Sequence, residues 1–91
     1  MEGKIILITG ASSGIGAGTA QHFAKWHCRL VLVGRNTDAL QETAYRCKEA
    51  GAQDVLVIGN KDLSDASVTR SVIDEAVAYY KGDADFFFVE K

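Results

Sequence analysis

The sequence contains no proline, only two cysteines and no excess of charge of one sign. Because proline, repeats and low-complexity stretches are all missing, nothing marks an internal linker, and we expect one domain over residues 1–91. Cys28 and Cys47 lie too far apart for a Cys-x-x-Cys redox or zinc motif. We interpret both as small buried side chains in a reducing compartment.

Charge clusters and long apolar runs are also missing. The 12 acidic and 10 basic side chains give a formal net charge of −2, without the lysine and arginine cluster of a nucleic-acid surface. No apolar run approaches the roughly 18 residues that span a bilayer, and the four residues before the first run leave no room for a signal peptide. We therefore expect a cytoplasmic protein with no nucleic-acid or membrane partner. His22 and His27 are five residues apart and do not share a helix face as a metal-binding pair would.

Short apolar runs alternate with amphipathic segments along the chain. The apolar runs predict strands over residues 4–9, 29–34, 54–58 and 86–89. Apolar residues at helical spacing predict helices over residues 14–27, 37–50 and from Ser64 or Asp65 to Tyr80. This alternation predicts an α/β fold in layers, with a parallel sheet and right-handed crossovers.

Individual residues predict where the helices begin, where they end and which side they bury. Asn36 or Thr37 is the expected N-cap of the second helix, Gly51 is its left-handed C-cap, and Gly82 ends the third helix. The expected inner faces are Ile15, Ala20, Phe23, Ala24 and Trp26 in the first helix, Leu40, Ala44 and Cys47 in the second, and Val68, Val72, Ala76 and Tyr79 or Tyr80 in the third.

The most informative segment is Thr-Gly-Ala-Ser-Ser-Gly-Ile-Gly, residues 9–16, between the first predicted strand and the first predicted helix. Glycine has no Cβ, so the backbone can turn sharply and bring its N–H groups close to a phosphate. Unpaired N–H groups and the positive end of the helix dipole stabilise an anion there. The predicted pyrophosphate contacts are the backbone of Gly10, Gly14, Ile15 and Gly16 and the hydroxyl groups of Ser12 and Ser13.

This string departs from the Gly-x-Gly-x-x-Gly fingerprint of dinucleotide-binding folds and resembles the cofactor-binding signature of the short-chain dehydrogenase/reductase family. The resemblance covers nearly all of the chain, but only the front part of the family's longer fold. It implies a partial Rossmann-like three-layer α/β sandwich with a parallel sheet, about four strands in the order 3-2-1-4 and three helices.

The residues after the second and third predicted strands indicate which nucleotide binds. Arg35 and Asn36 follow the second strand, where no carboxylate is present to bond the ribose diol of NAD. The guanidinium fork fits a 2′-phosphate, which favours NADP (NADPH) over NAD and is similar to NADP-preferring family members. By the same resemblance, Asp62 of the pair Asp62-Leu63 accepts a hydrogen bond from the adenine amino group.

The family's catalytic tyrosine precedes a lysine by four residues, a pattern that Tyr45, Tyr79 and Tyr80 do not provide. The resemblance therefore implies an NADP-dependent oxidoreductase that transfers hydride to or from a carbonyl or alcohol, with its catalytic part absent and this chain inactive alone. A non-catalytic dinucleotide-binding or interaction module is the alternative. A nucleoside triphosphate hydrolase is disfavoured because no Gly-Lys-Ser or Gly-Lys-Thr follows the glycines, whereas a Rossmann-type methyltransferase stays open.

The last residues, Val89-Glu90-Lys91, stand where the family has Asn-Asn-Ala-Gly. We interpret the chain as a truncated or alternatively terminated reductase, an expectation that sequencing of the parent transcript tests. The strand over residues 86–89 would then form an uncovered apolar edge. Such an edge favours self-association or pairing with full-length subunits of the family.

Overall fold

The computed structural model describes residues 3–12, 14–62, 64–80 and 86–89. Within these ranges four strands and three helices alternate: β1 (Ile5–Thr9), α1 (Gly14–Ala24), β2 (Arg29–Val33), α2 (Thr37–Ala50), β3 (Asp54–Ile58), α3 (Ala66–Tyr79) and β4 (Phe86–Val89). The predicted alternation is confirmed. Among the described residues, no helix has the length and the apolar character that crossing a membrane requires.

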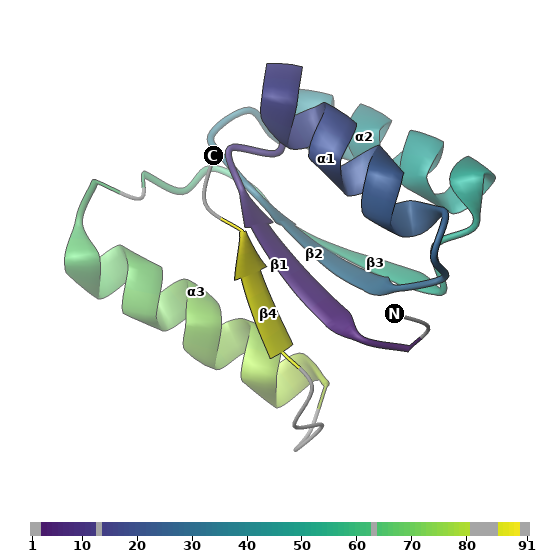
Figure 1. The fold of residues 1–91 in the computed structure, drawn as a ribbon. Coiled ribbons are helices and arrows are strands. Elements are labelled where there is room, and N and C mark those ends of the chain that lie inside the picture. Colours follow the sequence, from purple (N-terminus) through teal and green to yellow (C-terminus); the bar gives the residue numbers. More distant parts are fainter. Residues whose placement is uncertain (1–2, 13, 63, 81–85, 90–91) are drawn as a thin grey trace.

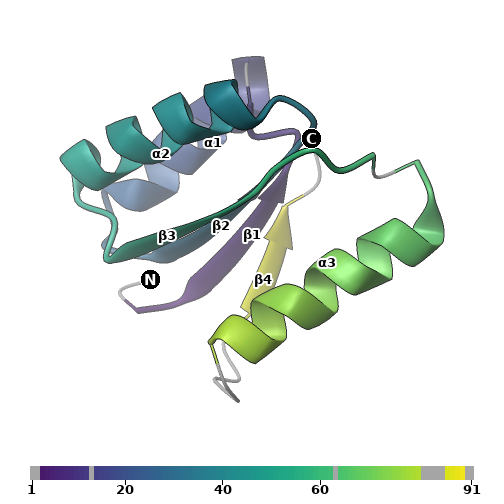
Figure 2. The same ribbon diagram turned by 180° about the vertical axis from the view of Figure 1, so that it is seen from behind.

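The four strands form one parallel sheet in the order β3-β2-β1-β4 (Figure 1). Helices α1 and α2 cover one face of this sheet and α3 covers the other, as two opposite views show (Figure 1 and Figure 2). The partial three-layer Rossmann-like fold is thus confirmed, with the predicted strand order. Because the strands are parallel, the loops that follow β1, β2 and β3 leave from the same end of the sheet.

Each face of the sheet packs on its helices through a separate apolar cluster. Along β1 the side chains alternate, so that Ile6 lies in the cluster under α1 and α2 and Ile5 in the cluster under α3. The buried helix residues include the predicted Leu40, Ala44 and Cys47 of α2 and Val72 and Ala76 of α3. Cys28 and Cys47 are both buried, as predicted. Burial raises the pKa of both thiols, to about 11 for Cys47.

The caps of α2 and the start of α3 follow the sequence prediction. Asn36 is the N-cap of α2, where its side-chain oxygen accepts the N–H of Ala39 at 3.1 Å. Gly51 ends α2 with φ of 117°. Asp65 rather than Ser64 caps α3. The predicted end of the third helix at Gly82 lies outside the described residues.

The prediction for α1 is wrong at its end and on part of its face. The helix ends at Ala24, because the next three N–H groups bond to carbonyl groups three residues back and His27 adopts a left-handed φ of 58°. Ile15 and Trp26 do not face the sheet, since their side chains are 76% and 54% exposed. The buried residues of α1 are the small ones, Gly16, Ala20 and Ala24, which let the helix approach the sheet closely.

Candidate functional site

The turn between β1 and α1 has the tight geometry that its glycines predict. Gly10 and Gly14 adopt φ of 62° and 60°, a left-handed conformation that residues with side chains disfavour. A β-carbon on Gly16 would overlap the carbonyl oxygen of Gly10 and lie 2.7 Å from its carbonyl carbon. The first turn of α1 therefore lies directly against the loop, which places the helix N-terminus at the carboxyl end of β1.

Backbone hydrogen bonds connect the loops that leave β1, β2 and β3. The N–H groups of Ala11, Gly34 and Lys61 donate to the carbonyl groups of Val33, Ile58 and Gly34, at 3.2, 3.4 and 3.2 Å. These bonds continue the strand pairing beyond the ends of the strands. They fix the loop after β2, which carries Arg35, beside the loop after β3, which carries Asp62.

Arg35 and Asp62 form an ion pair with each other. The Arg35 Nη2 atom lies 2.9 Å from Asp62 Oδ1, and the two side chains are 76% and 56% exposed. The same oxygen accepts the backbone N–H of Ser64 at 3.0 Å. Hydrogen bonds from Ser64, followed by the one from Arg35, lower the pKa of Asp62 to about 2. The carboxylate is therefore ionised at neutral pH and faces solvent, where a ligand can reach it.

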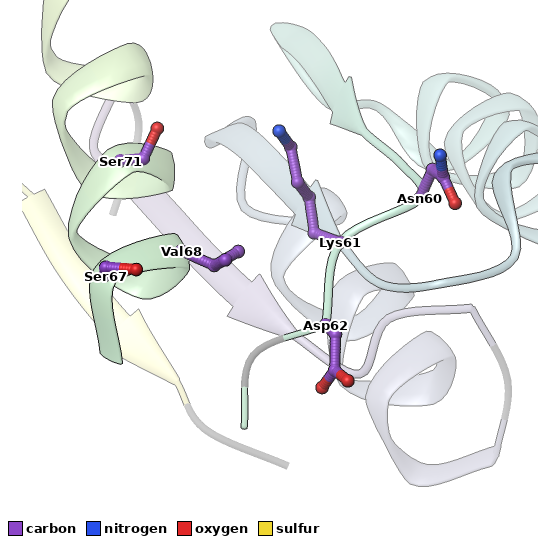
Figure 3. Close-up of a pocket in the computed structure, with 6 residues that line it drawn as sticks. All are labelled: Asn60, Lys61, Asp62, Ser67, Val68 and Ser71. Carbon is purple, nitrogen blue, oxygen red and sulfur yellow. The ribbon is translucent and has the colours of Figure 1, made fainter. Parts of the chain in front are cut away.

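An open hollow of about 360 Å³ lies between the loop after β3 and α3 (Figure 3). It is lined by Asn60, Lys61, Asp62, Ser67, Val68 and Ser71. Figure 3 shows that the side chains of Lys61 and Asp62 point in opposite directions from their loop. Arg35, and not the neighbouring Lys61, is therefore the cationic partner that the structure gives to Asp62.

The other predicted contacts lie near this end of the sheet where they are described. Ser12 is half-buried, and its hydroxyl lies 3.4 Å from the position of a β-carbon on Gly34, at the exit of β2. Ile15 presents an exposed side chain in the first turn of α1. Asn36 uses its side-chain oxygen to cap α2. Ser13 and Leu63 lie outside the described residues.

One residue that shapes the site was missed by the sequence analysis. A β-carbon on Gly59 would overlap Oγ1 of Thr37, the first residue of α2, and lie 2.9 Å from its Cβ. Glycine at this position lets the loop after β3 pass close to the start of α2, which brings Asp62 within reach of Arg35. The available signal was a glycine directly after an apolar strand, a position where close backbone approach is common.

Comparison with known proteins gives a match over almost the whole chain. The family model described as short chain dehydrogenase matches residues 4–88. The 11-beta-hydroxysteroid dehydrogenase A of Sesamum indicum is 44% identical over 77 residues, which are 85% of this chain and 22% of that protein. Short chain aldehyde dehydrogenase 1 of Euphorbia lathyris is 38% identical over 89 residues, which are 97% of this chain and 29% of that protein.

Solved structures show the same partial overlap. L-sorbose reductase from Gluconobacter frateurii, complexed with NADPH and L-sorbose, aligns with a TM-score of 0.81 and 35% identity over 90% of this chain and 31% of that one. The citronellol catabolism dehydrogenase of Pseudomonas aeruginosa aligns with a TM-score of 0.79 and 30% identity over 87% of this chain and 32% of that one. The chain thus spans less than a third of the length of these proteins.

Proposed function

This chain belongs to the short-chain dehydrogenase family, and we propose that it binds a pyridine dinucleotide at the carboxyl ends of β1, β2 and β3. The observation that carries the proposal is the turn from Gly10 to Gly16. Its two left-handed glycines and the close contact of Gly16 with Gly10 allow backbone N–H groups at the start of α1 to approach a pyrophosphate. In this proposal Gly14 and Ile15 contribute backbone N–H groups to the site. Ser12 and Ser13, which carry hydroxyl groups, belong to the same loop in the sequence.

We further propose that the nucleotide is NADP(H) rather than NAD(H). Arg35, at the exit of β2, supplies donors for the 2′-phosphate, and Asn36 beside it carries no negative charge that would repel one. The NADPH complex of the similar L-sorbose reductase supports the choice. In this proposal Asp62 accepts a hydrogen bond from the adenine amino group, and Leu63 follows it along the adenine-binding loop.

The proposed chemistry is hydride transfer between NADP(H) and a carbonyl or alcohol substrate, in which this chain supplies the cofactor-binding part. The sequence has no Tyr-x-x-x-Lys, so we expect no turnover by the 91-residue chain alone. Residues 1–91 form one domain in this proposal, supported by the single sheet that joins the four described strands. The side chains of Cys28 and Cys47 are buried in the apolar cluster under α1 and α2, which supports a cytoplasmic location.

NADPH is expected to raise the melting temperature of the chain more than NADH does. A ligand that binds only the folded form stabilises it by RT ln(1 + [L]/Kd), which is about 2.7 kcal/mol at one hundred times Kd. For 91 residues this corresponds to a shift of roughly 10 °C or more. Thermal melts with both nucleotides at equal concentration measure it. Equal shifts with the two nucleotides would remove the NADP assignment. If circular dichroism shows that the chain is folded and neither nucleotide shifts its melting temperature, the proposed function is removed.

A non-catalytic binding or interaction module is the second candidate. It is supported by β4, which lies at an edge of the described sheet and carries Phe87 with 46% of its surface exposed. Exposed apolar strands at a sheet edge pair readily with other chains, either a second copy or a full-length subunit of the family. Carbonyl-dependent oxidation of NADPH by the pure chain would favour the enzyme, whereas stabilisation by NADPH without turnover favours the module.

The chain is expected to self-associate, and Phe87→Lys is expected to weaken that association. A lysine on an edge strand opposes pairing with another edge because its charge would have to be desolvated. In sedimentation velocity, the weight-average mass of the wild type should grow as the concentration increases, and that of the variant should grow less. Tyr45→Lys is the matched control, since Tyr45 is an aromatic residue on α2 with 66% exposure. A wild-type monomer at every concentration contradicts this expectation.

A further inference from the structure

Arg35 and Asp62 are assigned to two different parts of the nucleotide, yet the structure joins them to each other. In the proposed site Arg35 binds the 2′-phosphate, while Asp62 binds the adenine amino group. The ion pair of 2.9 Å uses Nη2 of Arg35 and Oδ1 of Asp62. A 2′-phosphate at Arg35 would therefore meet a guanidinium that already has an anionic partner.

We propose that Asp62 is a specificity-determining residue that competes with the 2′-phosphate of NADP(H) for the Arg35 guanidinium. This inference rests on the proposed function, because it concerns the same nucleotide site. NADH has no 2′-phosphate and leaves the ion pair in place. In this proposal the 2′-phosphate of NADPH takes the Nη2 donor that Asp62 holds, so the ion pair weakens the binding of NADPH alone and narrows the preference for NADPH over NADH.

The geometry indicates that Arg35, and not Asp62, is the partner that moves. Oδ1 of Asp62 is also held by the backbone N–H of Ser64 at 3.0 Å. The loop of Asp62 is fixed as well, because the N–H of Lys61 bonds to the carbonyl of Gly34 at 3.2 Å. Arg35 has a long side chain that is 76% exposed, so it can swing from the carboxylate to a phosphate without disturbing the loop.

Among the described residues of this loop, no other cation faces the Asp62 carboxylate to balance its charge when Arg35 leaves. Lys61 is the adjacent positive charge, and Figure 3 shows its side chain directed away from the Asp62 carboxylate. The hydrogen bonds from Ser64 are the largest causes of the lowered pKa of Asp62, so the carboxylate remains charged at neutral pH when Arg35 leaves. The competition is therefore between two anions for one guanidinium.

Asp62→Asn removes the negative charge of this residue but keeps an oxygen that accepts hydrogen bonds. Asparagine retains a side-chain oxygen for the N–H of Ser64 and for an adenine amino group, but it cannot form an ion pair with Arg35. We expect the Kd of NADPH to fall about two- to fivefold, the range for an exposed ion pair, and the Kd of NADH to stay unchanged. Isothermal titration calorimetry of the full 91-residue chain with NADPH and with NADH measures both.

Two further variants distinguish competition for Arg35 from a general effect of charge. Asp65→Asn removes the same charge three residues away, from a carboxylate that caps α3, and asparagine is an equally good cap. It should leave the Kd of NADPH unchanged. In an Arg35→Gln background, Asp62→Asn should also give no gain in NADPH affinity, because Asp62 and the phosphate then have no guanidinium to compete for.

The outcomes separate this inference from the proposed function. The gain in NADPH affinity could persist in the Arg35→Gln background, or Asp65→Asn could reproduce it. Either result would show long-range repulsion between the carboxylate and the phosphate, and would overturn the proposed competition. Weaker NADPH binding by Asp62→Asn would also overturn it, because Asp62 would then position Arg35 for the phosphate. If the folded wild type binds neither nucleotide, the proposed function fails and the inference fails with it.

Discussion

Gly16→Ala is expected to abolish nucleotide binding and to lower the free energy of unfolding by about 1–3 kcal/mol, the range for overpacked sites. The added β-carbon would overlap the carbonyl oxygen of Gly10 and approach its carbonyl carbon to 2.7 Å. Neither group is the flexible end of a side chain, so the backbone of the turn must move. That movement displaces the N–H groups at the start of α1 that are proposed to hold the pyrophosphate. Urea denaturation measures the stability, and calorimetric titration with NADPH measures the binding.

Gly18→Ala provides the matched control within the same helix. Gly18 is exposed in α1, and a β-carbon there would have no heavy atom within 4 Å apart from the backbone of its own helix and its chain neighbours. Because alanine favours a helix more than glycine does, this variant should be more stable by up to about 1 kcal/mol and should bind NADPH like the wild type. If both substitutions have the same effect on stability and binding, the close contact between Gly16 and Gly10 is not what the site requires.

The fold could be predicted because its determinants are local. The apolar run before each turn defines a strand, and the spacing of Leu40, Ala44 and Cys47 defines the inner face of α2. Asn36 and Gly51 mark the ends of that helix through bonds and dihedral angles within a few residues. The alternation of strands and helices predicts a parallel sheet, whereas the observed strand order β3-β2-β1-β4 is the one that the resemblance to the family implied.

Residues of α1 show where hydrophobicity misled the prediction. Ile15 and Trp26 are two of the three large apolar residues expected on its inner face, yet both are exposed, whereas Gly16 and Ala20 face the sheet. Close packing selects small residues there, and a count of apolar side chains cannot detect that selection. The contact between Arg35 and Asp62 could not be predicted either, because it depends on how closely Gly59 lets one loop approach the start of α2.

Arg35→Asp is expected to reverse the nucleotide preference, from NADPH to NADH. Charge-assisted hydrogen bonds contribute about 1.5–3 kcal/mol, so their loss alone weakens NADPH binding by roughly ten- to one-hundredfold. The new carboxylate also repels the 2′-phosphate, and Asp62 nearby adds a second negative charge that its former partner no longer balances. For NADH, the same carboxylate can accept hydrogen bonds from the ribose diol. The ratio of the two Kd values, from calorimetric titrations of one preparation, measures the reversal.

Arg70→Asp makes the same change in net charge at an exposed position of α3 and serves as the control. It should leave the ratio of Kd values unchanged, because the preference depends on a guanidinium beside the ribose and not on the total charge of the chain. Thermal melts without nucleotide show whether each variant is folded. An Arg35→Asp variant that is folded and still prefers NADPH would mean that another residue holds the 2′-phosphate. Asp62 and the 2′-phosphate would then not compete for Arg35, and the inference about Asp62 would fail as well.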